Sequence, residues 1–353
     1  MPAAPASSPG LSVVIPSWEG RALLQKFLPS VVQSVDAFQS TCSLPAEIFV
    51  ADDASSDDTP AWLRAHFPSV RCESSPTRCG FAPTVNRGVR AARYSAVYVL
   101  NNDVALEPDT LSSLLPHLSD PFVFAVTGQV HDFASGLLRG AVQLARFRRG
   151  FLGIHERLYV NASDSSPSAP FLTLWASGGS TLFDREKFLA LGGFEELFAP
   201  FGWEDVELCL RAWKQGFTIH YEPRSSIWHQ FSSTIGSRHS RRHVRAVYER
   251  NRLWAHWMHL DTPRQFAAHF SILFLKLLAD PFAFRWETWS AFLQALRGLS
   301  NIRARRRDLL ARRRVLLTSV QQLLAAQVHR PEAHPLHEET APTRPCPYSP
   351  PQP

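Results

Sequence analysis

The chain has 353 residues, of which 45% are hydrophobic, 19% charged and 11% aromatic. This composition excludes a disordered or fibrous protein and is sufficient for one core of ordinary domain size with a smaller appendage. The net charge is +6, but 17 basic and 5 acidic residues lie between Ser237 and Val320, so the rest of the chain is net acidic. The basic region therefore needs an explanation of its own.

The cysteines and the first residues bear on the cellular compartment. The cysteines are odd in number, scattered and without zinc-ligand spacing, so a reducing compartment is the simplest interpretation. Residues 1–10, MPAAPASSPG, have neither the basic nor the apolar region of a secretory signal, and we expect them to be disordered. The five cysteines are Cys42, Cys72, Cys79, Cys209 and Cys346.

Apolar runs that predict strands alternate with spacings that predict helices in the N-terminal part of the chain. Strands are expected at residues 11–16, 47–51 and 96–100, and helices at 22–38, 59–67 and 82–93. This alternation predicts an α/β fold with right-handed crossovers and a mainly parallel sheet. Ligands of such sheets bind at the carboxyl ends of the strands.

The pattern continues beyond residue 170. A strand of small residues is expected at 173–183, a tight turn at 192–194, and a helix that Glu204 and Asp205 open and Gly216 ends. Two short strands are expected at 217–221 and 227–229.

The C-terminal third has a different character. Residues 237–328 are predicted to form basic, amphipathic helices. The Pro-rich residues 329–353 lack apolar periodicity, and we expect a disordered tail there.

Polar residues follow two of the predicted strands directly. Asp52 and Asp53 end the second strand, where a carboxylate would accept the imide N–H of a uracil or thymine ring. Ordinary turn chemistry is the alternative interpretation. Arg64 or Arg78 would be able to reach the same nucleotide, and the sequence does not decide between them.

A divalent metal ion would need hard oxygen ligands. Asp103, with Asn102 as a weaker donor, follows the strand at 96–100 and offers them, although a plain turn has the same sequence pattern. His229 follows a short apolar strand; a neutral imidazole can complete the coordination of a metal, and a structural histidine is the alternative.

Glu204 and Asp205 lie at a predicted helix N-terminus, where acidic residues are favoured by the helix dipole. A capping pair explains them, and so does a general base directed at an acceptor hydroxyl. The dipole would lower the pKa of such a base, whereas burial and the neighbouring carboxylate would raise it.

Taken together, the order of these motifs resembles the family 2 glycosyltransferases of the GT-A fold, in particular their non-processive, rhamnosyltransferase-like branch. The resemblance covers residues 11–236, which we expect to form a GT-A catalytic domain. The matching segments are VVIPSWEG (13–20), VADDASSDDT (50–59), GFAPTVNRGVRAA (80–92), YVLNNDVALEPD (98–109), SGGSTLF (177–183), LGGFEELFAPFGWEDVELCLRAWKQGF (191–217) and IWHQFSSTIG (227–236).

The resemblance implies a role for each matching residue. Asp205 would be the catalytic base, and Asp103 and His229 would hold Mg²⁺ or Mn²⁺ on the diphosphate of a UDP- or dTDP-sugar. The implied donor-binding residues are Pro16, Asp52, Asp53, Gly80, Asn86, Asn102 and Asp103. The implied acceptor-binding residues are Gly178, Gly179, Trp203 and Glu204, and Phe201 would stack on an acceptor ring or fill the core.

The family implies inversion at the anomeric carbon in one displacement, without a covalent intermediate. Two departures from its pattern are visible: Asn101 and Asn102 replace the first carboxylates of the metal motif, and Glu195 stands where many members have Asp. The QxxRW motif and membrane spans of the processive members are missing, which favours addition of one or a few sugars.

The basic helices admit three interpretations. Arg, Trp and Phe on amphipathic helices suit docking at an anionic membrane surface. A solvated helical bundle packed on the catalytic domain explains them as well. The arginine clusters would also allow nucleic-acid binding, but the sequence shows no fold known to recognise nucleic acids. The resemblance favours membrane docking, because many members glycosylate lipid-linked saccharides. It implies a cytoplasmic protein, peripheral at the inner face of the membrane.

Two other classes of protein remain as alternatives. One is a non-catalytic nucleotide- or glycan-binding protein on the same fold, against which intact Asp103, Asp205 and His229 argue. The other is a nucleotidyltransferase, for which SWEGRA (17–22) is a poor phosphate loop. The sugar, the acceptor, the linkage and the oligomeric state are left open.

Overall fold

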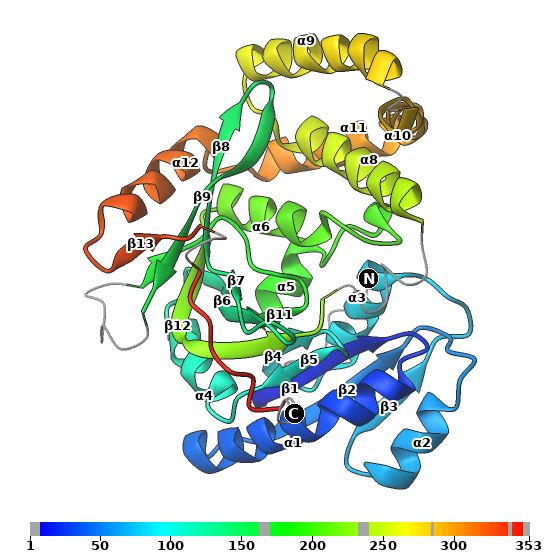
Figure 1. The fold of residues 1–353 in the computed structure, drawn as a ribbon, viewed down its shortest axis with the longest axis vertical. Coiled ribbons are helices and arrows are strands. Elements are labelled where there is room, and N and C mark those ends of the chain that lie inside the picture. Colours follow the sequence, from blue (N-terminus) through cyan, green and yellow to red (C-terminus); the bar gives the residue numbers. More distant parts are fainter. Residues whose placement is uncertain (1–7, 162–169, 232–239, 284–285, 338–340, 349–353) are drawn as a thin grey trace.

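The computed structural model describes residues 8–161, 170–231, 240–283, 286–337 and 341–348. A large twisted sheet with helices on both faces forms one part of the molecule, and a layer of helices covers one end of it (Figure 1). The strand order of the sheet is β10-β12-β6-β11-β4-β1-β2-β3, with β5 paired to β12 and β7 paired to β6.

The first half of the sheet is parallel. Its strands are β1 (Ser8–Ser17), β2 (Ala46–Asp52), β3 (Arg71–Ser74) and β4 (Tyr94–Leu100), and its helices are α1 (Arg21–Cys42), α2 (Thr59–His66) and α3 (Phe81–Ala91). The next strand along the sheet, β11 (Ser180–Asp184), is antiparallel to both β4 and β6 (Val123–Asp132).

Both faces of β1 are buried, which explains its continuous apolar sequence. Leu11, Val13 and Ile15 face α1, while Val14 faces α3. The packing on α3 is close, because a Cβ added to Gly88 would lie 2.5 Å from a methyl carbon of Val14.

The middle of the chain extends the sheet and adds a long hairpin. Its elements are β5 (Val104–Leu106), α4 (Thr110–Leu114), η1 (Leu115–Ser119), β7 (Leu138–Gly140), β8 (Val142–Arg148), β9 (Phe151–Val160), β10 (Phe171–Leu172), α5 (Arg185–Leu191), η2 (Glu196–Phe198), α6 (Glu204–Lys214) and β12 (Thr218–His229). The β8–β9 hairpin reaches up to the helical layer, where Leu152 N donates to His256 Nε2.

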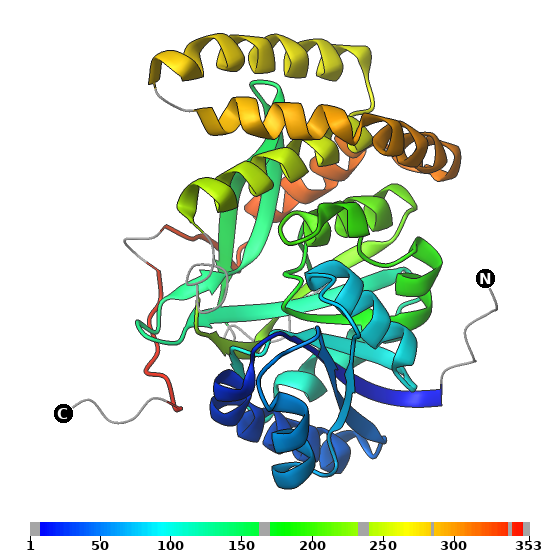
Figure 2. The ribbon, with the colours of Figure 1, turned by 90° about the vertical axis from the view of Figure 1, so that its right-hand side faces the viewer.

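The helical layer comprises α8 (Arg241–His259), α9 (Pro263–Ala279), η3 (Asp280–Ala283), α10 (Trp286–Arg297), α11 (Leu299–Arg312), α12 (Leu317–Ala325) and η4 (Ala326–His329). Trp254, Trp257 and Leu277 are among its buried residues. Figure 2 shows α9 as the outermost helix, on the side away from the sheet. No helix in the described ranges is both long and apolar enough to cross a bilayer.

The structure confirms the α/β fold, its mainly parallel sheet and the helical region that follows. It differs from the sequence prediction at two places between residues 170 and 231. The strand predicted at 173–183 is limited to β11, Ser180–Asp184, because Thr173 and Leu174 bond to Ile219 and Gln143 in a loop. The two strands predicted at 217–221 and 227–229 are a single strand, β12, with a register shift between Glu222 and Ser226.

The prediction of a disordered tail from His329 is wrong for the part of the tail that the structure describes. Ala333–Pro335 form strand β13, which pairs antiparallel with β9. Farther on, Leu138 N donates to Pro342 O and Arg344 N to Gly136 O. At the other end, residues 8–10 of the segment predicted to be disordered belong to β1, whereas residues 1–7 lie outside the described ranges.

Candidate functional site

The carboxyl ends of β1, β2 and β4 meet at one edge of the sheet. Ser17, the last residue of β1, lies opposite Asp52 in the parallel register. Its carbonyl oxygen accepts from Asp53 N at 2.8 Å, and its hydroxyl oxygen accepts from Asn102 Nδ2 at 3.1 Å. The polar clusters predicted at two separate strand ends are thus brought together.

Asp53 holds the loop that precedes α3. Its two carboxylate oxygens accept from Cys79 N at 2.8 Å and Gly80 N at 2.9 Å. Gly80 has φ of 92°, a backbone conformation that L-residues rarely adopt, so this loop favours glycine at that position. The carboxylate of Asp53 therefore orders the edge of the site.

Asp52 is the residue of the pair that keeps an oxygen without a partner. The side chain is buried, Oδ2 accepts from Ser55 N at 3.3 Å, and Oδ1 has no hydrogen bond among the described residues. A buried carboxylate oxygen without a partner suits an N–H donor supplied by a ligand.

Two of the predicted donor-binding residues, Pro16 and Asn86, are engaged in contacts within the protein itself. Pro16 is buried within β1, paired with Ala51. The amide of Asn86 donates to Phe194 O and Glu196 and accepts from Phe194 N, so all its polar atoms are used in fixing the turn before η2.

Sequence reasoning missed two contacts at this edge. Arg87 donates to Asp52 O at 2.7 Å and so fixes the end of β2. The guanidinium of Arg78 lies 3.3 Å from the centroid of the Trp18 ring, just after β1. Of the two arginines left open, Arg78 is thus in contact with the residue that follows the end of β1.

Asp103 and His229 come together through strand pairing. Asp103 immediately precedes β5, His229 ends β12, and the antiparallel register sets Val104 opposite His229. Asp103 Oδ1 and His229 Nε2 are 3.1 Å apart, and both side chains are at least four-fifths buried.

This donor pair suits a divalent cation. Two ligands of one ion, each at about 2.1 Å and at a right angle, would be separated by about 3 Å. One carboxylate with one imidazole matches Mn²⁺, and Mg²⁺ also takes one or two protein ligands with substrate phosphates. No group of three or more His, Cys, Asp or Glu side chains is arranged to hold a metal in the described ranges.

Gly178 and Gly179 connect Asn101, which follows β4 two residues before Asp103, with the predicted base Asp205. Gly179 O accepts from Asn101 N at 2.9 Å, and Gly178 N donates to Asp205 Oδ2 at 3.2 Å. Neither position admits a larger side chain without movement, because an added Cβ would lie 2.3 Å from the Asn101 amide at Gly179 and 3.3 Å from Asp205 Cβ at Gly178.

Asp205 lies in the first turn of α6, beside Glu204. Burial raises the pKa of the Asp205 carboxyl, and hydrogen bonds from Gly178 N and Val206 N oppose the shift. Burial and then the charge of Asp205 raise the pKa of Glu204 to about 8, and its Oε2 is buried without a partner among the described residues. Both shifts favour the protonated form of a carboxyl, and the shift of the Glu204 pKa is large enough to favour that form at neutral pH.

The loop before α6 is held by α8, which the sequence did not indicate. Asn251 Nδ2 lies 2.7–3.0 Å from the carbonyl oxygens of Phe198, Phe201 and Gly202. Trp203, at φ of 71°, follows this loop and is partly exposed. Tyr248 of α8 stands next to Phe201, with ring centroids 5.9 Å apart.

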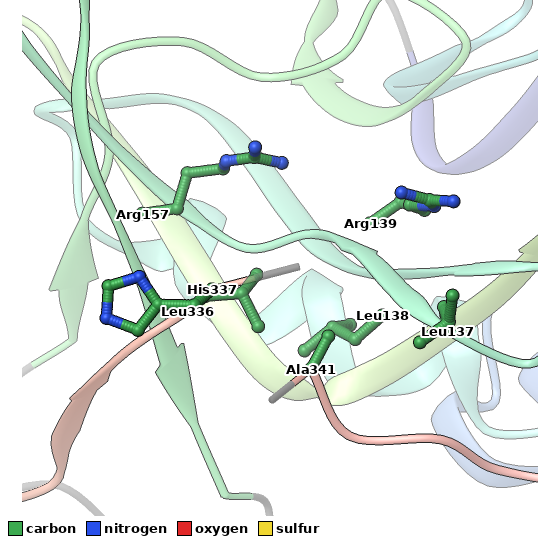
Figure 3. A pocket seen from close by; sticks show the side chains of 7 residues that line it. All are labelled: Leu137, Leu138, Arg139, Arg157, Leu336, His337 and Ala341. Carbon is green, nitrogen blue, oxygen red and sulfur yellow. The ribbon is translucent and has the colours of Figure 1, made fainter. Parts of the chain in front are cut away.

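A separate small pocket lies away from these residues. Figure 3 shows it between β7, β9 and the C-terminal tail, lined by Leu137, Leu138, Arg139, Arg157, Leu336, His337 and Ala341. None of the predicted site residues lines it.

The fold of this chain is the GT-A type found in nucleotide-diphospho-sugar transferases. Residues 12–188 match the family model described as glycosyl transferase family 2, and residues 156–232 match one described as the N-terminal domain of galactosyltransferase. The first match spans half of the chain, and the chain belongs to glycosyl transferase family 2.

Two relatives illustrate the similarity. Polypeptide N-acetylgalactosaminyltransferase 16 of Mus musculus is 25% identical over 230 residues, 63% of this chain and 40% of the relative. N-acetylglucosaminyl-diphospho-decaprenol L-rhamnosyltransferase of Mycobacterium tuberculosis is 26% identical over 267 residues, 67% of this chain and 82% of the relative. The chain thus spans less than half the length of the first of these.

Solved structures share the fold. GalNAc-T7 with UDP, GalNAc and Mn²⁺ gives a TM-score of 0.56 at 16% identity, covering 72% of this chain and 48% of that one. S. aureus TarS 1-349 gives 0.52 at 14% identity, covering 90% and 86%.

Proposed function

We propose that this chain transfers a sugar from a UDP- or dTDP-sugar to a hydroxyl group of a saccharide, with inversion at the anomeric carbon. The observation that carries the proposal is the turn of Gly178 and Gly179, which bonds to the Asn101 end of β4 and to Asp205. A donor diphosphate at the Asp103–His229 pair would therefore lie next to a carboxylate able to take the proton of an acceptor.

The nucleotide base would bind at the end of β2. The unpartnered Oδ1 of Asp52 would accept the imide N–H that uracil and thymine share, which is why UDP and dTDP are both candidates. Asp53 and Gly80 would shape the edge around the base, and the partly exposed ring of Trp18, with the guanidinium of Arg78 over it, would lie beside the base.

The diphosphate would lie over Asp103 and His229, which would hold Mg²⁺ or Mn²⁺. When bound, the ion would supply positive charge to stabilise the leaving diphosphate. Asn102, fixed by Ser17, would position the strand end from which Asp103 projects.

The proton of the acceptor hydroxyl would pass to Asp205. As its O–H bond breaks, the acceptor oxygen forms a bond to the anomeric carbon from the face opposite the diphosphate, and the bond from that carbon to the diphosphate oxygen breaks. The raised pKa of Asp205 supports the role, because a carboxylate with higher proton affinity is a better base near neutral pH.

The acceptor would occupy the side formed by Trp203, Glu204 and Tyr248. Trp203 and Tyr248 offer partly exposed aromatic surface, on which sugar rings stack. A protonated Glu204 would be able to donate to an acceptor oxygen. A lipid-linked saccharide is the acceptor class we favour, since the name of the rhamnosyltransferase relative, 82% of which is covered, gives a diphospho-decaprenol substrate.

A membrane surface is the proposed partner of the helical layer. Large apolar side chains between 47% and 89% exposed lie on α9, η3 and the start of α10, and we call them the apolar patch; its members are Phe270, Phe274, Leu275, Leu278, Phe282 and Trp286. Exposed arginines of the same layer, among them Arg242, Arg297 and Arg303, supply positive charge. Interfacial helices bind anionic membranes by inserting apolar side chains while their arginines contact the headgroups. We propose that the apolar patch binds the inner face of the membrane in this way.

Nucleotide binding tests the proposal first. UDP, dTDP and GDP are titrated with and without Mn²⁺ against the wild type and Asp103→Ala, with thermal shift as the readout. We expect stabilisation by UDP or dTDP that Mn²⁺ strengthens and that Asp103→Ala loses. A folded wild type that no nucleotide stabilises would contradict the transferase proposal, and metal-dependent binding without turnover of any sugar donor would favour a non-catalytic binding protein.

A further inference from the structure

Residues Ala341–Tyr348, which we call the strap, return from the helical side of the molecule to the sheet. Leu138 N donates to Pro342 O at 2.9 Å, Arg344 N donates to Gly136 O at 3.1 Å, and Thr343 bridges to Leu137. In Figure 1 the tail, drawn in red, runs from β13 down across the sheet. Figure 3 shows where the tail passes β7, with Ala341 beside Leu138.

The far end of the strap is fastened to β5 and β12. The hydroxyl of Tyr348 donates to Leu106 O, in the last residue of β5. Arg344 Nη2 pairs with Glu107 at 3.2 Å, and the same carboxylate accepts from Trp228 Nε1 at 3.1 Å. Tyr348 also packs against the small apolar cluster that contains Ala105 and Trp228.

These contacts are made at Leu106, Glu107 and Trp228, close in sequence to the two predicted metal ligands. Asp103 is the residue before β5, and His229 follows Trp228 at the end of β12. β5 has only three residues and lies off the main path of the sheet. A strand this short gives few ladder hydrogen bonds, so side chains that fix its far end help to hold its register against β12.

We propose that the strap is a positioning element for the metal pair: Arg344 and Tyr348 hold β5 against β12 and so keep Asp103 and His229 at the spacing that a divalent cation requires. This inference rests on the proposed function, in which that pair binds the metal. Arg344 and Tyr348 act through Leu106, Glu107 and Trp228, as outer residues commonly orient metal ligands.

Manganese affinity measures the effect directly. The full chain is prepared as wild type, Arg344→Ala and Tyr348→Phe, and free Mn²⁺ is followed by its electron paramagnetic resonance signal during titration in the presence of UDP. We expect about 10-fold weaker Mn²⁺ binding for Arg344→Ala, a size typical of outer-shell substitutions, and a smaller loss for Tyr348→Phe, which removes one oxygen atom. Metal-free UDP binding, which depends on the end of β2, should be unchanged in both.

Thr343→Ala is the matched control, since Thr343 is exposed and contacts Leu137 through its backbone. Melting temperatures without metal are measured for all variants. If Arg344→Ala has a lower melting temperature than the wild type, the conclusion is drawn from the Mn²⁺ affinity of Tyr348→Phe. If both variants bind Mn²⁺ as tightly as the wild type, the inference about the strap is wrong and the proposed function is unaffected. If the wild type itself binds no Mn²⁺ with UDP or dTDP, or binds it no better than Asp103→Ala, the proposed metal site is wrong and the proposed function fails with it.

Discussion

The Asp205 carboxylate accepts two backbone N–H groups, from Gly178 and Val206, and these bonds fix its orientation while burial raises its pKa. Asn at this position keeps the size of the side chain but is unable to accept a proton. We therefore expect Asp205→Asn to lower kcat about 100-fold or more, the usual contribution of a general base. Steady-state kinetics with excess donor measure kcat.

Binding of UDP with Mn²⁺ should be retained in Asp205→Asn, because the proposed nucleotide and metal sites do not include Asp205. Asp308→Asn, an exposed carboxylate on α11, is the control for a change of charge alone. Wild-type kcat in Asp205→Asn would exclude it as the base.

Glu204 makes stability depend on pH. Its pKa rises from an ordinary 4.5 to about 8 in the folded chain, so the folded state binds the proton more tightly than the unfolded state. The stability that this proton contributes is fully present below pH 4.5 and is lost as the pH rises through about 8. Glu204→Gln, which stays neutral, should therefore melt at a higher temperature than the wild type at pH 9 and lose this advantage at pH 5.

Differential scanning calorimetry at several pH values measures this difference. Glu186→Gln, at an exposed position of α5, is the control. A Glu204→Gln variant whose melting temperature follows that of the wild type at every pH would show that Glu204 is ionised without penalty.

At the scale of elements, α6 and its preceding loop are held by α8. Glu207, fully buried in α6, bonds to Arg211 and to His259 of α8, and Asn251 bonds to the loop carbonyls from the same helix. The helical layer therefore contributes to the arrangement of the loop and of the first turns of α6, on which the proposed acceptor site depends.

Asn251→Ala would leave buried carbonyl groups of Phe198, Phe201 and Gly202 without their donor. Each such loss costs about 1–3 kcal/mol, so we expect lower thermal stability. We also expect a higher KM for the acceptor at unchanged KM for the donor, because the loop leads into Trp203 and Glu204. Gln294→Ala, on α10, is the control; an equal rise in both KM values would argue for general loosening instead.

The elements that the sequence predicted best are those whose burial is local and regular. β1, β2 and β4 are buried on both faces and read as continuous apolar runs, and the polar residues that end β2 and β4 meet in the site. The contacts that hold these residues were not predictable. Asn251 acts across 49 to 53 residues of sequence, and Asn86 is engaged by Phe194, so no local pattern marks either one.

The errors have the same origin. Thr173 and Leu174 are buried by loop contacts to β12 and β8 rather than by strand pairing, and burial alone accounts for the apolar pattern that predicted a strand. The tail lacks periodicity because a few side chains, Arg344 and Tyr348 among them, make its contacts.

At the scale of the whole molecule, the sheet carries the candidate site, and α9, which carries four members of the apolar patch, is the helix farthest from the sheet (Figure 2). Phe274 and Phe282 are 61% and 89% exposed. Replacing both by Ser removes apolar area worth about 1.5–3 kcal/mol for each side chain if it were fully buried in lipid. We expect binding of the Phe274→Ser, Phe282→Ser variant to phosphatidylglycerol vesicles to fall at least about 10-fold in a sedimentation assay.

Phe122→Ser is the matched control, since Phe122 is 64% exposed and lies between η1 and β6, away from the helical layer. Binding of the wild type should weaken as salt is added and should be lower for phosphatidylcholine vesicles. Equal binding of the double variant and the control would exclude the patch as the membrane contact.

If the strap positions Asp103 and His229 as proposed, the metal site is completed only at a late stage of protein synthesis. Tyr348 and Leu106 are 242 residues apart in the sequence, so β5 and β12 have both left the ribosome well before the residues that fasten them. Nascent chains fold from the N-terminal side as they emerge. A chain cut by a protease between β13 and Ala341 would consequently keep Asp103, His229 and Asp205 yet resemble the nascent form. In that form β5 would be held by its ladder to β12 and by its contacts with α1, without the bonds to Arg344 and Tyr348.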